Sequence, residues 1–270
     1  MGFDLKQAIA SAAPGARLDV PAGTWAGGLT LDKPITLVGH GTARFDGLSR
    51  GPILTVRARD VVLEGFTFTN AVALAGAAVS FHEGTLTLRD CLFERCLAPT
   101  HGGGALYARG DSLLIDHCRF VENTGRAGGA VLLDQLVEAT VRQSLFLRNR
   151  AVRGGALRLK EGASAVVDRC TFVENTSVVD PPMASTIDVA GTKTRTPRLE
   201  LKQSAWIGSS PLELGRADQF PGEVVLTRNA LPPSLAGLGG ENRFEALEWF
   251  EERLKISTSA LGALGAVGAD

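Results

Sequence analysis

An aromatic residue recurs at a nearly constant spacing through the middle of the chain. The recurring residues are Phe68, Phe93, Phe120, Phe146 and Phe172, with gaps of 25, 27, 26 and 26 residues. Trp206 extends the series after a longer gap of 34 residues, which indicates an insertion between residues 178 and 197. A fixed period between about 20 and 50 residues is typical of stacked repeat architectures. We therefore expect each period to form one unit that stacks on the next.

Within each period, apolar and polar residues alternate on both sides of a two-residue polar interruption. Leu113 and Ile115 precede Asp116 and His117, and the alternation resumes at Cys118. Alternation with period two indicates short strands, and the interruption indicates a corner between them. Several short strands per period can stack on the previous coil at about 4.8 Å. The pattern predicts an all-β fold, a single-stranded right-handed parallel β-helix of about seven to eight coils.

Two further columns of the repeat predict turns. Gly-Gly-Ala opens a strand at residues 103–105, 128–130 and 154–156, and an asparagine follows each aromatic by three residues. These asparagines are Asn123, Asn149 and Asn175. Asparagine tolerates a left-handed backbone, and its amide can bond along a stack of identical amides. We expect a column of stacked asparagines at a turn.

Charged residues alternate in sign from one period to the next. The column four residues before each aromatic reads Glu64, Arg89, Asp116, Arg142, Asp168 and Lys202. A second column, two residues after the aromatic, reads Arg95, Glu122, Arg148 and Glu174. Opposite charges attract on neighbouring strands, whereas like charges repel. The alternating charges of the two columns are therefore expected to fix the register of the coils.

The ends of a β-helix need covers, and the sequence offers a helix at each end. Residues 1–15 contain a short helix candidate with Asp4 as its N-cap, and residues 16–240 carry the β-helix. Residues 241–256 form an amphipathic cap or docking helix, followed by a flexible tail over 257–270. The residues expected to dock on a partner are Phe244, Leu247, Trp249 and Phe250.

Composition narrows the function classes. The 28 basic and 29 acidic residues leave a net charge of −1, so we expect no nucleic-acid partner. The N-terminus lacks the charged and apolar parts of a secretory signal, and no apolar run is long enough to span a membrane. We expect a cytoplasmic protein, or an extracellular or periplasmic one if a leader was removed or a leaderless secretion route is used.

The four cysteines lack paired Cys-x-x-Cys motifs, so we expect no metal and no cofactor, but buried free thiols. Cys91 and Cys118 fall on neighbouring rungs and are the one pair near enough for a disulfide, whereas Cys118 and Cys170 lie two rungs apart. The sequence leaves the redox state of Cys91 and Cys118 open.

The motifs resemble known β-helix proteins. Gly-Gly-Ala-Leu/Val followed by Phe-x-x-Asn, over residues 103–123, 128–149 and 154–175, resembles the repeats of chlamydial polymorphic outer-membrane proteins and related bacterial right-handed β-helix proteins. Residues 5–47, with Pro-Ile-Thr-Leu-Val-Gly at 34–39, are similar to the first coils of the pectin-lyase-like superfamily. The resemblance implies the β-helix fold. It also implies two activities, surface adhesion or the cleavage of carbohydrate by a lyase or glycoside hydrolase.

The strand that begins at each Gly-Gly projects its outward side chains onto one long face. Two columns form this face: Ser80, Tyr107, Leu132, Arg158 and Asp188, and beside them His82, Arg109, Asp134, Lys160 and Ala190. We predict ligand binding at Tyr107, Arg109, Asp134, Arg158 and Lys160. Nearly every other conspicuous polar residue has a turn or stacking role. The sequence therefore favours a noncatalytic interaction or structural module that binds a protein or a glycan.

Two alternatives remain open. The first is a carbohydrate-active enzyme, a polysaccharide lyase or glycoside hydrolase, that acts on an acidic polysaccharide through Asp116, Arg142 and Asp168, with Arg158 and Lys160 as further candidates. The second is an adaptor or spike component of a bacterial secretion or phage-like assembly, in which the C-terminal helix or tail docks on another protein. The oligomeric state is open in each case.

Overall fold

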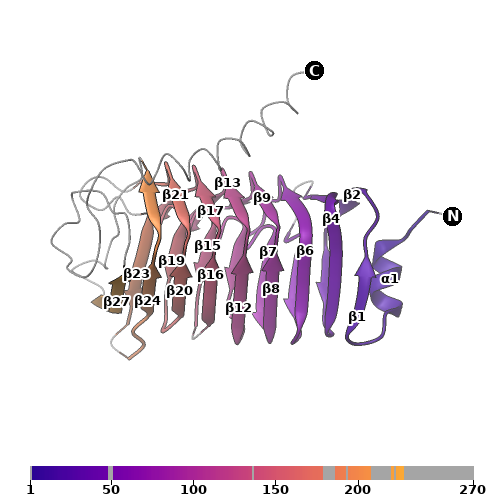
Figure 1. Ribbon diagram of the computed structural model, residues 1–270, viewed down its shortest axis with the longest axis horizontal. Helices are drawn as coiled ribbons and strands as arrows, with labels where there is room; N and C mark the ends of the chain where they lie inside the picture. Colours follow the sequence, from indigo (N-terminus) through magenta and orange to yellow (C-terminus); the bar gives the residue numbers. More distant parts are fainter. Residues whose placement is uncertain are drawn as a thin grey trace, which may run out of the picture.

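Equivalent residues of successive periods pair side by side in parallel strands. In the computed structural model, Phe120 pairs with Phe93 and Phe146, and Asp116 pairs with Arg89 and Arg142. The structure describes residues 2–47, 51–135, 137–178, 186–192, 194–207, 220–221 and 223–227. Figure 1 shows the strands of successive coils lined up along the long axis. The chain is a parallel β-helix, as the period predicted.

Three sheets run along the described part of the β-helix. The 15-stranded sheet contains β1 (Ala16–Asp19), β2 (Gly23–Ala26), β4 (Ile35–Asp46), β6 (Val61–Thr69), β8 (Thr85–Arg89), β9 (Leu92–Glu94), β12 (Ser112–Asp116), β13 (Arg119–Val121), β16 (Glu138–Arg142), β17 (Leu145–Leu147), β20 (Ser164–Asp168), β21 (Thr171–Val173), β24 (Arg198–Lys202), β25 (Ala205–Ile207) and β27 (Glu223–Thr227). The eight-stranded sheet contains β3 (Leu29–Leu31), β5 (Leu54–Arg57), β7 (Val79–Glu83), β11 (Leu106–Ala108), β15 (Val131–Leu133), β19 (Leu157–Leu159), β23 (Ile187–Gly191) and the antiparallel β26 (Phe220–Pro221). The four-stranded sheet contains β10 (Leu97–Ala98), β14 (Thr124–Ala127), β18 (Arg150–Arg153) and β22 (Thr176–Ser177).

The coil count and the N-terminal helix agree closely with the sequence. Between β3 and β23 the described chain completes about 6 turns, slightly fewer than the seven or eight coils expected. Helix α1 (Leu5–Ser11) starts at Asp4, whose side chain accepts a hydrogen bond from the Gln7 amide at 3.0 Å. Leu5 and Ile9 bury the inner face of α1 against the first coils. The predicted C-terminal helix, with Phe244, Leu247, Trp249 and Phe250, and the predicted tail lie outside the described residues.

A continuous stack of aromatic rings occupies the interior. Ring centroids lie 5.4 Å apart for Phe45 and Phe68 and 5.0 Å apart for Phe68 and Phe93. The next three gaps are 4.8, 4.9 and 4.9 Å, and Trp206 ends the stack 4.5 Å from Phe172. Because the spacing is close to that of neighbouring strands, the buried rings stack from coil to coil inside the β-helix.

The asparagine column forms the stack that the sequence predicted, with one correction. Asn123, Asn149 and Asn175 are fully buried, and Asn149 Nδ2 donates to Asn175 Oδ1 at 2.9 Å and to the Phe120 carbonyl at 2.9 Å. The expectation that these asparagines adopt the left-handed conformation is wrong. The preceding residue does so in each coil, since Glu122, Arg148 and Glu174 have φ values of 54°, 51° and 50°. The charged side chain of that residue thereby points out of the turn, and the amide points in.

The four cysteines are buried and free, as predicted. Cys118 lies on the same inward column as Ser144, whose hydroxyl accepts from the Cys118 amide at 3.1 Å. Burial raises the pKa of the Cys118 thiol well above its usual value and raises that of Cys96 to about 12. These thiols therefore stay protonated and act as small apolar side chains.

The one helix among the described residues is α1, and no helix there is long and apolar enough to cross a bilayer.

The asparagine stack gives the first testable prediction. Asn149→Ala removes the acceptor of the Asn123 backbone amide at 3.0 Å and of its side-chain amide at 3.0 Å. Because both donors are buried, the substitution should lower the free energy of unfolding by about 3 kcal/mol. Thr140→Ala, at an exposed position of the same coil, is the control and should change it by less than about 0.5 kcal/mol. Denaturant titration measures both, and equal effects would contradict a structural role for the stack.

Candidate functional site

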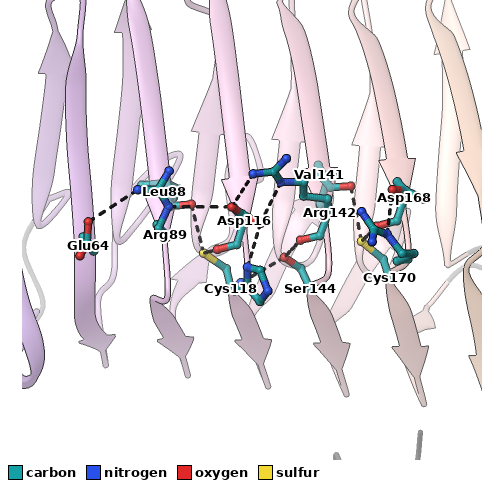
Figure 2. Close-up of polar contacts among 12 residues, drawn as sticks. Glu64, Leu88, Arg89, Asp116, Cys118, Val141, Arg142, Ser144, Asp168 and Cys170 are labelled. Atoms are coloured by element: carbon teal, nitrogen blue, oxygen red, sulfur yellow. Dashed lines mark hydrogen bonds and ion pairs between the residues drawn. The ribbon is translucent and has the colours of Figure 1, made fainter.

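The residues of the enzyme alternative belong to a column of charges on the 15-stranded sheet (Figure 2). Arg142 holds both oxygens of Asp116, with Nε 2.9 Å from Oδ1 and Nη2 2.8 Å from Oδ2. His117 Nδ1 lies 2.9 Å from Asp116 Oδ1, and Arg89 Nε lies 3.8 Å from Oδ2. The Asp116 side chain is only 5% exposed. The hydrogen bonds from Arg142 hold the pKa of this carboxyl below its usual value.

Direct ion pairs follow the alternation of charge over only part of this column. Arg89 bridges Glu64, at 3.7 Å, and Asp116. Beyond Arg142 the Cα register continues, but the side chains take local partners. Asp168 accepts from Arg169 at 3.0 Å. Lys202 lies 2.9 Å from Glu200.

The second column shows the same mixture. Arg148 lies 2.9 Å from Glu174 and 3.5 Å from Glu122 on the two neighbouring coils. Arg95 bonds Glu94 of its own coil at 3.0 Å. Sequence alternation therefore places opposite charges on neighbouring rungs, and the contacts then depend on what else lies within reach.

This geometry supports a structural role for Asp116, Arg142 and Asp168. Asp116 and Arg142 are in contact, but Asp168 bonds Arg169, so the three do not converge on one point. A general base needs a lone pair directed at substrate. Both oxygens of Asp116 are instead directed at Arg142.

Reversal of the charge at Asp116 tests the structural role. Asp116→Arg would place three arginines on consecutive rungs with little access to water, so we expect a loss of about 2 to 4 kcal/mol in unfolding free energy. Arg109→Asp, on an exposed position of another sheet, is the matched reversal and should cost less than about 1 kcal/mol. Thermal or denaturant unfolding measures both, and comparable losses would rule out a special role for the column.

The predicted ligand-binding residues lie together on the outer face of the eight-stranded sheet. Tyr107 pairs with Leu132, and Leu132 pairs with Arg158, on β11, β15 and β19. The coils stay aligned beyond the ends of these strands, as two backbone hydrogen bonds show. The Asp134 amide donates to the Ala108 carbonyl at 2.8 Å, and the Lys160 amide donates to the Leu133 carbonyl at 2.9 Å. Arg109, Asp134 and Lys160 thus follow one another on consecutive coils.

Tyr107 and Asp134 form the centre of this group. The Tyr107 hydroxyl donates to Asp134 Oδ2 at 3.1 Å, and the Asp134 residue is 8% exposed. Its other oxygen, Oδ1, is buried and has no hydrogen-bond partner. Burial raises the pKa of Tyr107 to about 12, and the negative charge of Asp134 adds to the shift. The pair therefore presents one satisfied and one unsatisfied acceptor.

His82 and Ser80 extend the group by one coil, a contact that sequence reasoning missed. The Ser80 hydroxyl lies 2.9 Å from His82 Nε2, and the His82 ring centroid is 6.0 Å from that of Tyr107. Burial, together with the charges of Arg57 and Arg109, lowers the pKa of His82. The imidazole is therefore uncharged at neutral pH. The same-face spacing of Ser80 and His82 in the sequence is the signal that could have indicated the pair.

The face is open over only part of its length. Arg158 Nε lies 2.9 Å from Asp188 Oδ2, with side chains 9% and 2% exposed, and Leu132 is also buried. Arg109 is exposed and donates to Gln135 Oε1 at 2.6 Å, and Lys160 is partly exposed. The accessible side chains are therefore Tyr107, Arg109 and Lys160, and the buried Asp134 is bonded to Tyr107. These four residues are here named the Tyr107 surface, and Arg158 lies in a buried ion pair beside it.

Comparison with known proteins places the chain only at the level of fold. No protein-family model matches it, and no curated protein matches it significantly. Among solved structures, it is similar to the pectin methylesterase from Aspergillus niger, at 12% identity and a TM-score of 0.46, over 78% of this chain and 85% of that one.

Two alginate lyases are also similar. The complex of AlyF-OU02 with G6 matches at 10% identity and a TM-score of 0.40, over 88% of this chain and 78% of that one. A PL6 alginate lyase complex with a trisaccharide matches at 11% identity and a TM-score of 0.34, with the same coverage of 88% and 78%. These similarities are too distant to assign a role to any residue. The described residues contain no group of three or more side chains that could hold a metal ion.

The lone tyrosine of the sequence provides a direct spectroscopic test of the Tyr107–Asp134 pair. The alkaline absorbance titration of the folded protein should show tyrosinate formation near 12, against about 10 in denaturant. Asp134→Asn should lower the folded value, because the negative charge of Asp134 raises the tyrosine pKa. Arg109→Ala should not lower it, since the charge of Arg109 acts in the opposite direction. A folded wild-type value near 10 would contradict the pair.

Proposed function

We propose that this protein is a noncatalytic β-helix module that binds a glycan at the Tyr107 surface. The observation that carries the proposal is the buried oxygen of Asp134, Oδ1, which has no hydrogen-bond partner. Asp134 is bonded to Tyr107, and Arg109 occupies the equivalent position in the preceding coil. A buried acceptor without a donor costs about 1 to 3 kcal/mol. Because Oδ1 is closed to solvent, a ligand hydroxyl reaches it only if the side chains that cover it shift, and donation to Oδ1 would then recover that cost.

The charges next to Asp134 restrict the chemical class of the ligand further. Arg109 and Lys160 are cations on the coils next to Asp134, so a ligand ammonium group would meet repulsion from them where a neutral hydroxyl would not. Arg109 and Lys160 are donors on the two coils that flank Asp134, and they suit the ring and hydroxyl oxygens or a carboxylate of a sugar. A central acceptor, flanking donors and a half-buried aromatic side chain together favour a polyhydroxylated ligand.

A second candidate, a carbohydrate-active enzyme, is favoured by one observation on the same surface. The uncharged His82 lies next to Tyr107, and a neutral imidazole can accept a proton from a substrate. In that case catalysis would use His82 rather than Asp116, Arg142 and Asp168. If the wild-type protein turns over a glycan and His82→Ala does not, the protein is this enzyme and not a noncatalytic binding module.

Glycan binding is tested with a panel of neutral and uronate-containing oligosaccharides by calorimetry or glycan array. We expect binding to the wild-type protein and at least a tenfold loss in Tyr107→Ala and in Asp134→Asn. Lys160→Ala should weaken binding to a smaller extent, because one of several donors is lost. Arg17→Ala, an exposed arginine on β1, should bind as the wild type does.

The same samples are examined for new reducing ends and unsaturated products, which the binding module should not generate. Two results would overturn the proposal. One is the absence of binding to every glycan of the panel, and the other is binding that Tyr107→Ala and Asp134→Asn leave unchanged.

A further inference from the structure

A stripe of exposed apolar side chains runs along the outer face of the four-stranded sheet. Leu74 is 66% exposed, Leu97 36%, Val152 41% and Val178 47%. Besides these four, the large hydrophobic residues exposed in the described chain are Phe3 and Val225. Exposed apolar residues are therefore concentrated on this face, here named the apolar stripe, and such concentration marks an interaction surface.

The strand register places the members of the stripe on four of five consecutive coils, because the coil of β14 contributes Arg126 in place of an apolar residue. Gly125 pairs with Ala151, and Ala151 pairs with Ser177, so the residues that follow them, Arg126, Val152 and Val178, are aligned. Leu97 of β10 continues the face in the preceding coil, and Leu74 follows the bridge between Val72 and Leu97 in the coil before that. The stripe therefore spans five coils parallel to the long axis and is interrupted by Arg126 in the third coil.

The face around the stripe is basic. Arg126 and Arg150 are exposed and Arg153 is partly exposed, on β14 and β18. Residues 97–101, 124–127, 150–153 and 176–178 contain no aspartate or glutamate. An occupant of this face should therefore combine an apolar side with acidic residues.

We propose that the apolar stripe binds residues 241–256 of the same chain as an amphipathic helix. This segment carries apolar residues at helical spacing, Phe244, Leu247, Phe250 and Leu254, and glutamates at 245, 248, 251 and 252. Its apolar side complements Leu97, Val152 and Val178, and its glutamates complement Arg126 and Arg150. The proposal is independent of ligand binding at the Tyr107 surface, which lies on another sheet.

The dimensions agree with this occupant. A helix over residues 241–256 would be about 24 Å long at 1.5 Å per residue. Five coils at about 4.8 Å cover about 19 Å between the first and the last, and side chains extend beyond both. Residues 228–240 can span up to about 43 Å. The last described strand, β27, lies two coils beyond the one that carries Val178, at about 10 Å, so the connection is long enough.

Hydrogen exchange of the full-length protein tests the docking. In the wild type, amides of residues 241–256 should exchange at least tenfold more slowly than in the double variant Val152→Asp, Val178→Asp. Docking in the variant would bury two aspartates against the apolar side of the helix, which is unfavourable. Amides of β11 and β15 should not change. Val225→Asp is the matched control, since Val225 is 37% exposed on a different sheet, and it should leave the segment protected.

A charge exchange gives a second, independent measurement. Arg126→Glu with Arg150→Glu should reduce the protection of residues 241–256, and the addition of Glu245→Lys with Glu248→Lys should restore part of it. Light scattering over a concentration series identifies whether the segment binds in its own chain. Three outcomes would overturn the proposal: an unprotected segment in the wild type, protection insensitive to both sets of variants, or protection that appears only with dimer formation.

Discussion

In-register parallel pairing between successive coils is the constraint on which the rest of this structure depends. The aromatic stack shows its strength, because ring planes of Phe93, Phe120 and Phe146 lie 6° and 7° from parallel with centroids 4.8 and 4.9 Å apart. Parallel rings at this separation fall within the offset-stacked range that isolated aromatic pairs also favour. The backbone spacing of about 4.8 Å sets their separation, and the interior must be composed of side chains that tolerate a copy of themselves in the coils above and below.

This requirement divides the polar residues between the interior and the outside of the coils. An asparagine amide has both a donor and an acceptor, so each one can bond the next along the axis, and Asn123, Asn149 and Asn175 are buried without an unmet partner. A charged side chain cannot stack on its own kind in this way. Charges therefore lie outside and alternate in sign, and where the alternation does not give contact, as at Asp168, a neighbour in the same coil supplies the opposite charge.

The sequence predicts whatever repeats, and it fails where a position depends on local surroundings. The period of the phenylalanines predicted the fold, and the columns in register with it predicted the corners, the inward thiols and the asparagine stack. The left-handed backbone at Glu122 and Arg148 gave no signal, because charged side chains have no special preference for positive φ and tertiary pairing imposes it. Alternation likewise identified Leu132 and Arg158 as outward-facing, yet both are buried. The period-two pattern fixes which way a side chain points and says nothing of what covers it.

The candidate binding site lies where the repeat is broken, and stacking explains why. On the inner side of β7, β11, β15, β19 and β23 the aligned residues are all aliphatic: Val79, Leu106, Val131, Leu157 and Ile187. Their outward neighbours change chemistry at every coil, from Ser80 through Tyr107 to Asp188. Since the inner residues and the backbone hold the register, the outer residues are free to differ without loss of alignment. The result is a rigid row of unlike side chains about 4.8 Å apart, and in the neighbouring column Asp134 has a buried oxygen without a hydrogen-bond partner.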